Sequence, residues 1–364
     1  MNKILYLVPI VFLIIGCAEE TQSIKIGANL ALSGKLAFYG TATKNGIELA
    51  VLDVNNAGGI AGKKLVLVSE DNQGDAKTAT VAMQKMLSVD KIDVAYSILT
   101  PITQAVVPLT QAENKLLMYH SAVSDMARKN SLAFRDYFDF ADQGAGLGVF
   151  VAPLHQKVAY FGEQSDVCEQ FYVAFANKMP QNSIVSKQTF DASETDFRTA
   201  LLKAKATGAQ VLVLCTWRSE DLVMKQLDQL GMLDTQTYHA VAQFLPSSHT
   251  VDDLFKKNHA VSTWYGFGMN TSDPKVQTFT ARYHQAYGVD PIPDALYSYD
   301  DVMFLSVAMK ACKSAEAGCV ANYLSTHDYN GVAGILHFGS ERVETRPSVL
   351  LQYGENGWEA VSSS

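Results

Sequence analysis

Short apolar runs rich in β-branched residues alternate with amphipathic stretches over the first third of the chain. Residues 24–30 and 64–71 have the apolar pattern of buried strands, and residues 93–98 and 116–119 repeat it. In the segment 43–59, apolar residues recur at the spacing of one helical face; they are Ile47, Ala50, Val51 and Val54. This alternation predicts a parallel sheet with helices on both faces.

A second alternating set begins near residue 157. Its strand patterns lie at residues 157–161, 183–190, 209–217, 237–241 and 261–267. The polar, glycine-bearing segment 134–148 separates the two sets and is typical of a crossing between domains. Two helical patterns follow residue 270, and the segment 331–361 reads as a β hairpin with polar turns. Because 364 residues can form two cores, we expect two α/β lobes.

The segment 57–64 combines glycines with lysines, as a phosphate-binding loop does. In such a loop the glycines follow a strand and the lysine opens a helix, so that helical N–H groups meet the phosphates. Here Gly58, Gly59 and Gly62 leave a predicted helix, and Lys63 enters a predicted strand. This order predicts a turn and not a nucleotide site.

The first residues join one lysine to an apolar run that is shorter than the roughly 20 residues needed to span a bilayer. This is typical of an export signal. Its end, Gly16 followed by Cys17, resembles the lipobox of bacterial lipoproteins. The resemblance implies that residues 1–16 are a signal peptide, that Cys17 carries a lipid, and that residues 17–23 are a tether on the periplasmic or cell-surface side of a membrane. The alternative is an ordinary secretory signal.

The cysteines and the net charge limit the kinds of partner and cofactor that this protein is expected to bind. An exported chain can form disulfides, and the close spacing of Cys312 and Cys319 predicts one. The pairing of Cys168 and Cys215 stays open. A formal net charge of −8 without a basic run argues against a nucleic-acid partner. Because the cysteines and histidines lack ligand spacing, we expect no metal and no cofactor.

The order and spacing of these segments resemble the leucine/isoleucine/valine-binding protein family, the type I periplasmic solute-binding proteins of ABC importers. The likeness covers nearly the whole mature chain, from "IKIGANLALSGKLAFYG" through "TDFRTALLKAKATGAQVLVLCTW" to "GVAGILHFG". It implies two Rossmann-like lobes with parallel sheets, joined by three hinge strands and closing on a ligand as a Venus flytrap. The implied lobes are residues 24–138 with 270–335 and residues 139–269 with 336–364, with hinges in "DYFDFADQ", near Gly268 and near Leu336.

The ligand of such a fold binds beyond the carboxyl ends of the strands. Polar or aromatic candidates at these ends are Ser33, Tyr39, Thr100, Ser121, Asp166, Trp217 and Arg218. The resemblance places Thr100 where the family binds the ligand carboxylate with a serine hydroxyl. It places Ser121, Ala122 and Val123 in the next binding loop, and Tyr39 and Trp217 in the aromatic wall. The alternatives are that Thr100, Ser121 and Asp166 only cap helices, that both aromatic residues only pack, and that Arg218 forms a surface ion pair.

Two positions depart from the family pattern. Val123 stands where the family has a threonine, and the glutamate that binds the ligand ammonium is absent from "HAVAQF", which leaves Gln243. Burying an ammonium without a carboxylate costs several kcal/mol. Asp166 is a candidate for the ammonium and Arg218 for a carboxylate. A neutral amide or an aromatic acid between Tyr39 and Trp217 is the alternative ligand.

The sequence lacks the motifs of hydrolytic enzymes, GxSxG and HExxH. His120 beside Ser121 is the one pairing of a base with a hydroxyl in the predicted cleft. We therefore expect no catalytic residues. The sequence predicts a monomeric lipoprotein that captures a small amino-acid-like or carboxylate solute and delivers it to an ABC permease, or a sensory receptor of the same fold.

Overall fold

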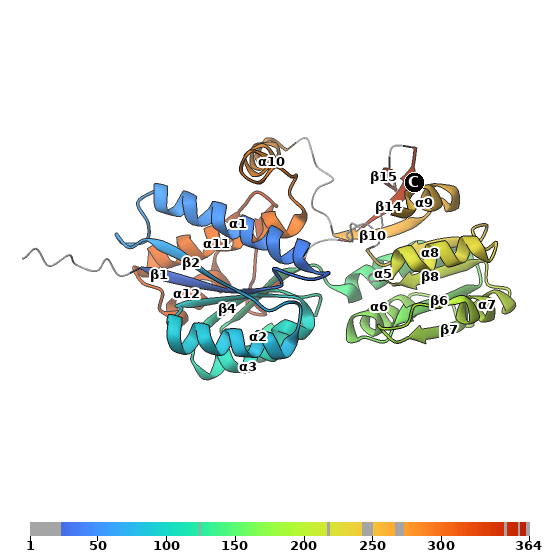
Figure 1. Cartoon of the computed structure of the whole chain (residues 1–364), viewed down its shortest axis with the longest axis horizontal. Helices are drawn as coiled ribbons and strands as arrows, with labels where there is room; N and C mark the ends of the chain where they lie inside the picture. Colours follow the sequence, from blue (N-terminus) through green and yellow to red (C-terminus); the bar gives the residue numbers. More distant parts are fainter. Residues whose placement is uncertain are drawn as a thin grey trace, which may run out of the picture.

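Two β-sheets, each covered by helices, form two lobes along the long axis of the molecule (Figure 1). The computed structural model describes residues 23–123, 125–216, 219–241, 250–265, 273–345, 348–355 and 357–361. Within these ranges, no helix combines the length and the hydropathy that a membrane crossing requires.

Lobe 1 contains a six-stranded sheet in the order β13-β5-β4-β3-β1-β2. Its strands are β1 (Ile24–Leu30), β2 (Leu65–Asp71), β3 (Val94–Ile98), β4 (Leu116–His120), β5 (Ala133–Tyr137) and β13 (Val343–Thr345). All neighbours are parallel, and β1 pairs Ile24 with Leu65 and Ile26 with Val94. Every residue of β3, β4 and β5 is buried, as expected for a parallel sheet covered on both faces.

Helices cover both faces of this sheet (Figure 1). They are α1 (Ala37–Asn56), α10 (Pro274–Tyr287), α11 (Pro293–Cys312), α12 (Ala317–Thr326), α2 (Ala76–Lys85) with a π-helical turn η1 (Met86–Asp90), α3 (Thr100–Ala112) and the short α4 (Asp125–Lys129). The helices α1 and α11 pack closely because Gly46 has no side chain: a Cβ there would lie 2.1 Å from the Ala295 carbonyl oxygen. The predicted turn at 57–64 is confirmed, since Gly58, Gly59 and Gly62 have positive φ and β2 follows.

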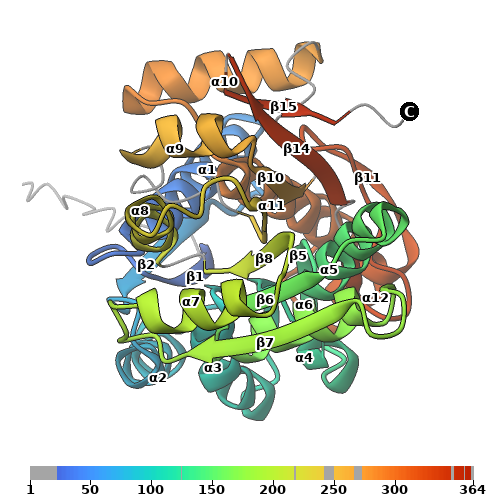
Figure 2. The same cartoon turned by 90° about the vertical axis from the view of Figure 1, so that its right-hand side faces the viewer.

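Lobe 2, which faces the viewer in Figure 2, contains a seven-stranded sheet in the order β15-β14-β10-β9-β8-β6-β7. Its strands are β6 (Val158–Glu163), β7 (Ile184–Phe190), β8 (Val211–Cys215), β9 (Gln236–His239), β10 (Val261–Tyr265), β14 (Ser348–Gly354) and β15 (Gly357–Ala360). The helices are α5 (Phe140–Val151) with a 3₁₀ turn η2 (Ala152–Leu154), α6 (Asp166–Ala176), α7 (Arg198–Ala206), α8 (Glu220–Gln229) and α9 (Asp252–Asn258). The pairs β10–β14 and β14–β15 are antiparallel, and the other neighbouring pairs are parallel.

The crossings between lobes differ in part from the prediction. The first joins β5 to α5, and the predicted hinge near Gly268 lies outside the described residues. The hinge predicted near Leu336 is wrong: β13 pairs with β5, so the chain stays in lobe 1 until Thr345. The reason is packing, because Leu336 is buried in the core and the ring of Phe338 lies 5.3 Å from that of Phe134.

The C-terminal segment 331–361 is therefore not one hairpin. The pair β11 (Tyr329–Asn330) and β12 (Ile335–Leu336) forms a small separate hairpin, β13 joins lobe 1, and β14 with β15 forms the hairpin that ends lobe 2. Residues 336–345 thus belong to lobe 1 and not to lobe 2 as predicted.

Two disulfides fix the ends of helices. The predicted pair Cys312–Cys319 is confirmed and joins the end of α11 to the start of α12. The pairing of the other two cysteines could not be predicted from the sequence. They form a second bridge, in which Cys168 in the first turn of α6 is bonded to Cys215 at the end of β8.

Candidate ligand-binding cavity

A cavity of about 150 Å³ lies between the lobes, at the carboxyl ends of strands from both sheets. Lobe 1 contributes Leu36, Tyr39, Gly74, Ile98, Leu99, Thr100, Pro101, Ile102, His120, Ser121, Ala122, Tyr137, Phe138 and Asp294; lobe 2 contributes Phe140, Glu163, Ser165, Val167 and Val241. The lining is mostly apolar, with few polar groups. This composition, and the position at strand ends, are typical of a small-molecule site in an α/β protein.

A pair of hydroxyl groups lies on the lobe 1 side of the cavity. Thr100 begins α3, and its Oγ1 lies 2.8 Å from the Oγ of Ser121, which follows β4. Thr100 does not cap α3 in the way the alternative interpretation required, because the start of α3 has no side-chain cap. The preceding Leu99 has a φ of +70°, which is unusual for a residue with a side chain. The backbone N–H groups in the first turn of α3 have no acceptor within the helix, and they lie beside the two hydroxyls. Together these donors can bind an acceptor group such as a carboxylate.

Arg135 holds the loop that carries Ser121. This side chain is fully buried, and its Nε donates a hydrogen bond of 2.6 Å to the Ser121 carbonyl oxygen. Its Nη2 donates to the carbonyl oxygen of Phe138 and lies 3.6 Å from Oδ2 of Asp139. Burial lowers the pKa of Arg135, and the Asp139 carboxylate opposes that shift. One cation thus ties the binding loop to the first crossing between the lobes.

Aromatic rings form much of the cavity wall. Tyr137 and Phe138 lie with ring centroids 4.4 Å apart, and Phe140 lies 5.3 Å from Phe138. The Tyr137 hydroxyl donates to Oδ1 of Asp294 at 3.1 Å. Burial raises the pKa of Tyr39 well above its usual value, and the Asp294 carboxylate adds to the shift, so this phenol stays neutral. The sequence reading treated "DYFDF" only as a hinge, although three aromatic residues at a lobe crossing are the signal that marks this wall.

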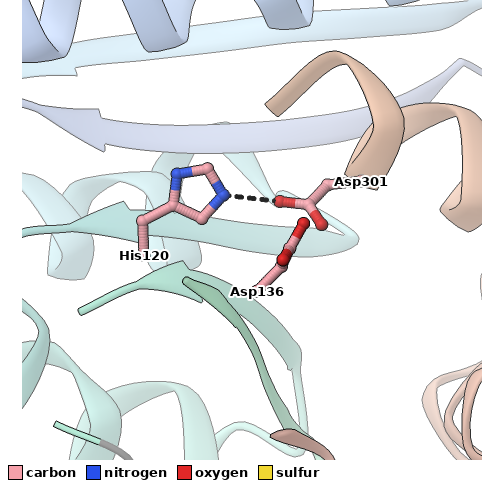
Figure 3. Close-up of side chains that lie close together, drawn as sticks. All are labelled: His120, Asp136 and Asp301. Carbon is pink, nitrogen blue, oxygen red and sulfur yellow. Dashed lines mark hydrogen bonds and ion pairs between the residues drawn. The ribbon is translucent and has the colours of Figure 1, made fainter. Parts of the chain in front are cut away.

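His120 links the cavity to a buried polar cluster in lobe 1 (Figure 3). Its Nε2 lies 2.8 Å from Oδ2 of Asp301, to which the Tyr96 hydroxyl donates at 2.6 Å. Asp136 completes a group whose nitrogen and oxygen atoms all lie within 4.8 Å of one another, close enough to hold a divalent cation. Hydrogen bonds account for the short distances among His120, Tyr96 and Asp301 without a metal ion. Because the His120 side chain contacts Asp301, we assign His120 a positioning role: it holds the end of β4 in place beside the cavity.

Carboxylates approach the cavity from both lobes. Glu163 ends β6 in lobe 2 and is 2% exposed, and Asp294 in the first turn of α11 is equally buried. Among the described residues that line the cavity there is no lysine or arginine. A cationic group on the ligand could therefore pair with either carboxylate. An anionic group could accept hydrogen bonds from the hydroxyls and N–H groups of lobe 1. Glu163 was missed because the end of β6 could not be located from the pattern of apolar residues.

The structure brings together four of the predicted site residues. Tyr39, Thr100, Ser121 and Ala122 line the cavity. Three others do not, and they are Ser33, Val123 and Asp166. Trp217, Arg218 and Gln243 lie outside the described residues.

Local structure explains why each of these three residues does not line the cavity. Ser33 is exposed in the turn after β1. Val123 is buried and donates its N–H to Oγ of Ser121 at 3.3 Å. Asp166 is exposed in an open depression beside Lys187, because β6 ends at Glu163 and Ser165 caps α6. The lobe 2 carboxylate that lines the cavity is thus Glu163 and not Asp166.

Comparison with known proteins gives a consistent picture. Residues 23–355 match the sequence profile of a family described as periplasmic binding protein. A Leu/Ile/Val-binding protein homolog 7 of Brucella melitensis biotype 1 is 24% identical over 362 residues, covering 93% of this chain and 90% of the relative.

Solved structures share the fold. The branched-chain amino acid transporter substrate binding protein LivJ from Streptococcus pneumoniae, in complex with isoleucine, has a TM-score of 0.81 at 24% identity, covering 93% of this chain and 99% of that one. An ABC transporter solute binding protein from R. palustris, in complex with benzoate, has a TM-score of 0.80 at 16% identity, covering 94% and 96%. These likenesses confirm the predicted fold class of two Rossmann-like lobes. The chain belongs to the periplasmic binding protein family, in the type I group of the Leu/Ile/Val-binding proteins, and is a binding protein rather than an enzyme.

Proposed function

We propose that this protein binds an amino acid, through its ammonium and carboxylate groups, and delivers it to an ABC permease. The observation that carries the proposal is the position of Glu163 across the cavity from the Thr100 and Ser121 hydroxyls. The hydroxyls and the α3 N–H groups suit the carboxylate, and Glu163 suits the ammonium. Glu163 thereby replaces the glutamate that the family pattern places elsewhere in lobe 2.

Opposite placement of these groups provides a mechanism for closure. The hydroxyls belong to lobe 1 and Glu163 to lobe 2, so a ligand that touches both makes all of its contacts only when the lobes are together. A ligand shifts such an equilibrium by its differential affinity for the two states. Amino-acid binding therefore stabilises the closed form that a permease would recognise.

The rest of the lining restricts the ligand side chain. Leu36, Ile98, Phe138, Phe140 and Val167 present apolar surface, and about 150 Å³ is small for a binding cavity. These features favour one apolar or aromatic side chain of amino-acid size, and disfavour peptides, sugars and nucleotides.

An aromatic acid is the second candidate ligand. The ring wall of Tyr137, Phe138 and Phe140 supports it, and the R. palustris protein of similar fold holds benzoate. The two candidates differ in one group, because only the amino acid has an ammonium that needs Glu163.

A matched ligand series tests the proposal. Calorimetric titration with phenylalanine and leucine, and with the deaminated and decarboxylated analogue of each, measures what each charged group contributes. We expect at least one of the two amino acids to bind and both of its analogues to bind at least tenfold more weakly, since each loses a charge-assisted hydrogen bond. A deaminated acid that binds as tightly as its parent would refute the amino-acid assignment and support the aromatic acid.

Replacing Thr100 by alanine is expected to weaken solute binding by roughly tenfold, because a hydrogen bond to a charged group contributes about 1.5 kcal/mol or more. Thr110→Ala on the same helix is the matched control. Its hydroxyl donates within the helix to the Val107 carbonyl oxygen at 3.0 Å, and Thr110 does not line the cavity. Titration of both variants, with thermal unfolding as a check on the fold, measures the difference. Equal affinity in the two variants would remove Thr100 from the site.

Lipid attachment at Cys17 and a role in transport complete the proposed function. Gly16 followed by Cys17 after the apolar run supports the lipid, and family membership supports an extracytoplasmic binding protein. A sensory role of the same fold is the alternative, and ligand specificity alone does not separate the two.

A further inference from the structure

A basic depression lies at the end of lobe 1 that faces away from the ligand cavity. It has a volume of about 440 Å³ and is lined by Ser23, Ile24, Lys25, Ile60, Lys63, Lys91, Asp93, Lys313, Ser314 and Ala315. These residues come from Ser23 and the first two residues of β1, from the segments just before β2 and β3, and from the turn between α11 and α12. The three strands are parallel neighbours, so their amino ends share one edge of the sheet, at the far left in Figure 1.

Four lysines and one aspartate line this depression, in a chain whose formal net charge is −8. The Lys25 ammonium donates to the Asp90 carbonyl oxygen at 2.8 Å, and its backbone N–H donates to Asp93. Lys91 and Lys313 are exposed, and neither forms an ion pair with any other residue that the structure describes. The edge is therefore locally cationic although the protein is acidic.

The backbone at two of these lysines is unusual. Lys91 and Lys313 each end a helix with a φ of +54°, in the left-handed region where glycine is the preferred residue. A side chain in this conformation costs free energy. Lysine at a helix C-terminus also offsets the helix dipole, which is the simplest explanation for one such residue. It does not explain why both ammonium groups border the same depression.

The position of this edge follows from the proposed lipid anchor. Ser23 lies in the depression, six positions after Cys17 in the chain. A chain of six residues spans at most about 20 Å, so a lipid at Cys17 would keep this edge close to the membrane surface. The disulfide Cys312–Cys319 closes the turn that carries Lys313, Ser314 and Ala315, and so fixes one wall of the depression.

We infer that this basic edge of lobe 1 docks on anionic phospholipid headgroups. The inference rests on the proposed lipid anchor, and not on the identity of the solute. The lysines supply charge attraction that the tether alone does not provide, and juxtamembrane lysines bind anionic lipid surfaces in this way. Docking holds the ligand cavity at the other end of the strands, about 20 Å from the bilayer for the seven residues of β1.

The test uses the mature, lipidated chain in vesicles of phosphatidylcholine alone or mixed with phosphatidylglycerol. Mass spectrometry after brief acylation measures the reactivity of each lysine. Docking is expected to lower the reactivity of Lys25, Lys63, Lys91 and Lys313 several-fold in the anionic vesicles only, and high salt is expected to restore it. Lys187 and Lys256 on lobe 2 are expected to keep the same reactivity in both kinds of vesicle.

The double variant Lys91→Gly/Lys313→Gly removes two charges at positions where glycine is conformationally favoured, so we expect its thermal unfolding temperature not to fall. Because each lysine near an anionic surface contributes roughly a fivefold factor, the loss of two lysines is expected to weaken docking about 25-fold, and Lys25 and Lys63 should regain reactivity. The matched control, Lys256→Gln/Lys257→Gln on α9, removes two charges from lobe 2 and should still dock. Unchanged lysine reactivity in anionic vesicles, or a mature chain without lipid at Cys17, would overturn the inference, whereas solute titration reports on the proposed function separately.

Discussion

Replacing Glu163 by glutamine is expected to weaken amino-acid binding by about a hundredfold or more. The substitution keeps the size of the side chain and one oxygen acceptor, and removes the negative charge. Glu163 is 2% exposed at the end of β6, so water screens its interaction with a ligand ammonium only weakly. Removing one partner of a buried, hydrogen-bonded charge pair costs about 2–5 kcal/mol, because the other charge is left without a partner. Calorimetric titration of the wild type and the variant measures the loss.

Glu169→Gln provides the matched control. Glu169 lies on the neighbouring helix α6, is exposed, and pairs with Lys187 at 2.7 Å outside the cavity. We expect its loss to leave affinity unchanged, since exposed pairs contribute little. The aromatic-acid candidate predicts the opposite sign for Glu163→Gln: a purely anionic ligand should bind the variant as tightly or more tightly, because a repulsive charge is gone. That result would exclude the ammonium contact.

The lobe architecture could be predicted because it depends on local patterns. Helical and strand periodicity over segments such as 43–59 and 64–71 survives in any context, and the glycines at 58, 59 and 62 require a turn. The third crossing could not be predicted in this way. Leu336 and Phe338 have the same apolar pattern whether they cross to lobe 2 or pack in lobe 1, and only their contacts with the lobe 1 core decide.

The candidate site was predictable only where the strand end could be located. Thr100 and Ser121 follow short apolar strands with clear ends, and both line the cavity. The chain reads "GEQSD" where β6 ends at Glu163, and the predicted carboxylate, Asp166, lies three positions beyond that end. Asp294 could not be predicted for another reason. It belongs to α11, far along the chain, and only the tertiary fold places it beside Tyr137.

The fold also shows how the two lobes are joined near the site. Arg135 lies in β5, and its guanidinium contacts both the loop that carries the Ser121 hydroxyl and the crossing at Phe138 and Asp139. A movement of the crossing during closure therefore acts on the binding loop through one buried side chain. This arrangement couples the hinge to the ligand site, and makes Arg135 a positioning residue.

Arg135→Met is accordingly expected to lower the free energy of unfolding of lobe 1 by about 3–5 kcal/mol, and to weaken solute binding. Methionine fills much of the volume but donates no hydrogen bond, so two buried carbonyl oxygens lose their donor and Asp139 loses its cation. Because the lobes can unfold separately, a single melting temperature is a poor measure. Hydrogen exchange of the β4 and β5 amides, compared with those of β8 in lobe 2, reports the loss where it occurs.

Two further variants separate this role from a general effect of removing an arginine. Arg282→Met breaks the surface pair in which Arg282 donates to both carboxylate oxygens of Asp53, at 2.8 and 3.0 Å. Because Arg282 is 40% exposed, we expect a cost of about 1 kcal/mol or less. Arg135→Lys keeps the charge but not the planar fork that contacts two carbonyl oxygens, and we expect it to recover only part of the stability. If the lobe 1 amides exchange hydrogen at the same rate in Arg135→Met and in Arg282→Met, Arg135 does not hold the binding loop to the crossing.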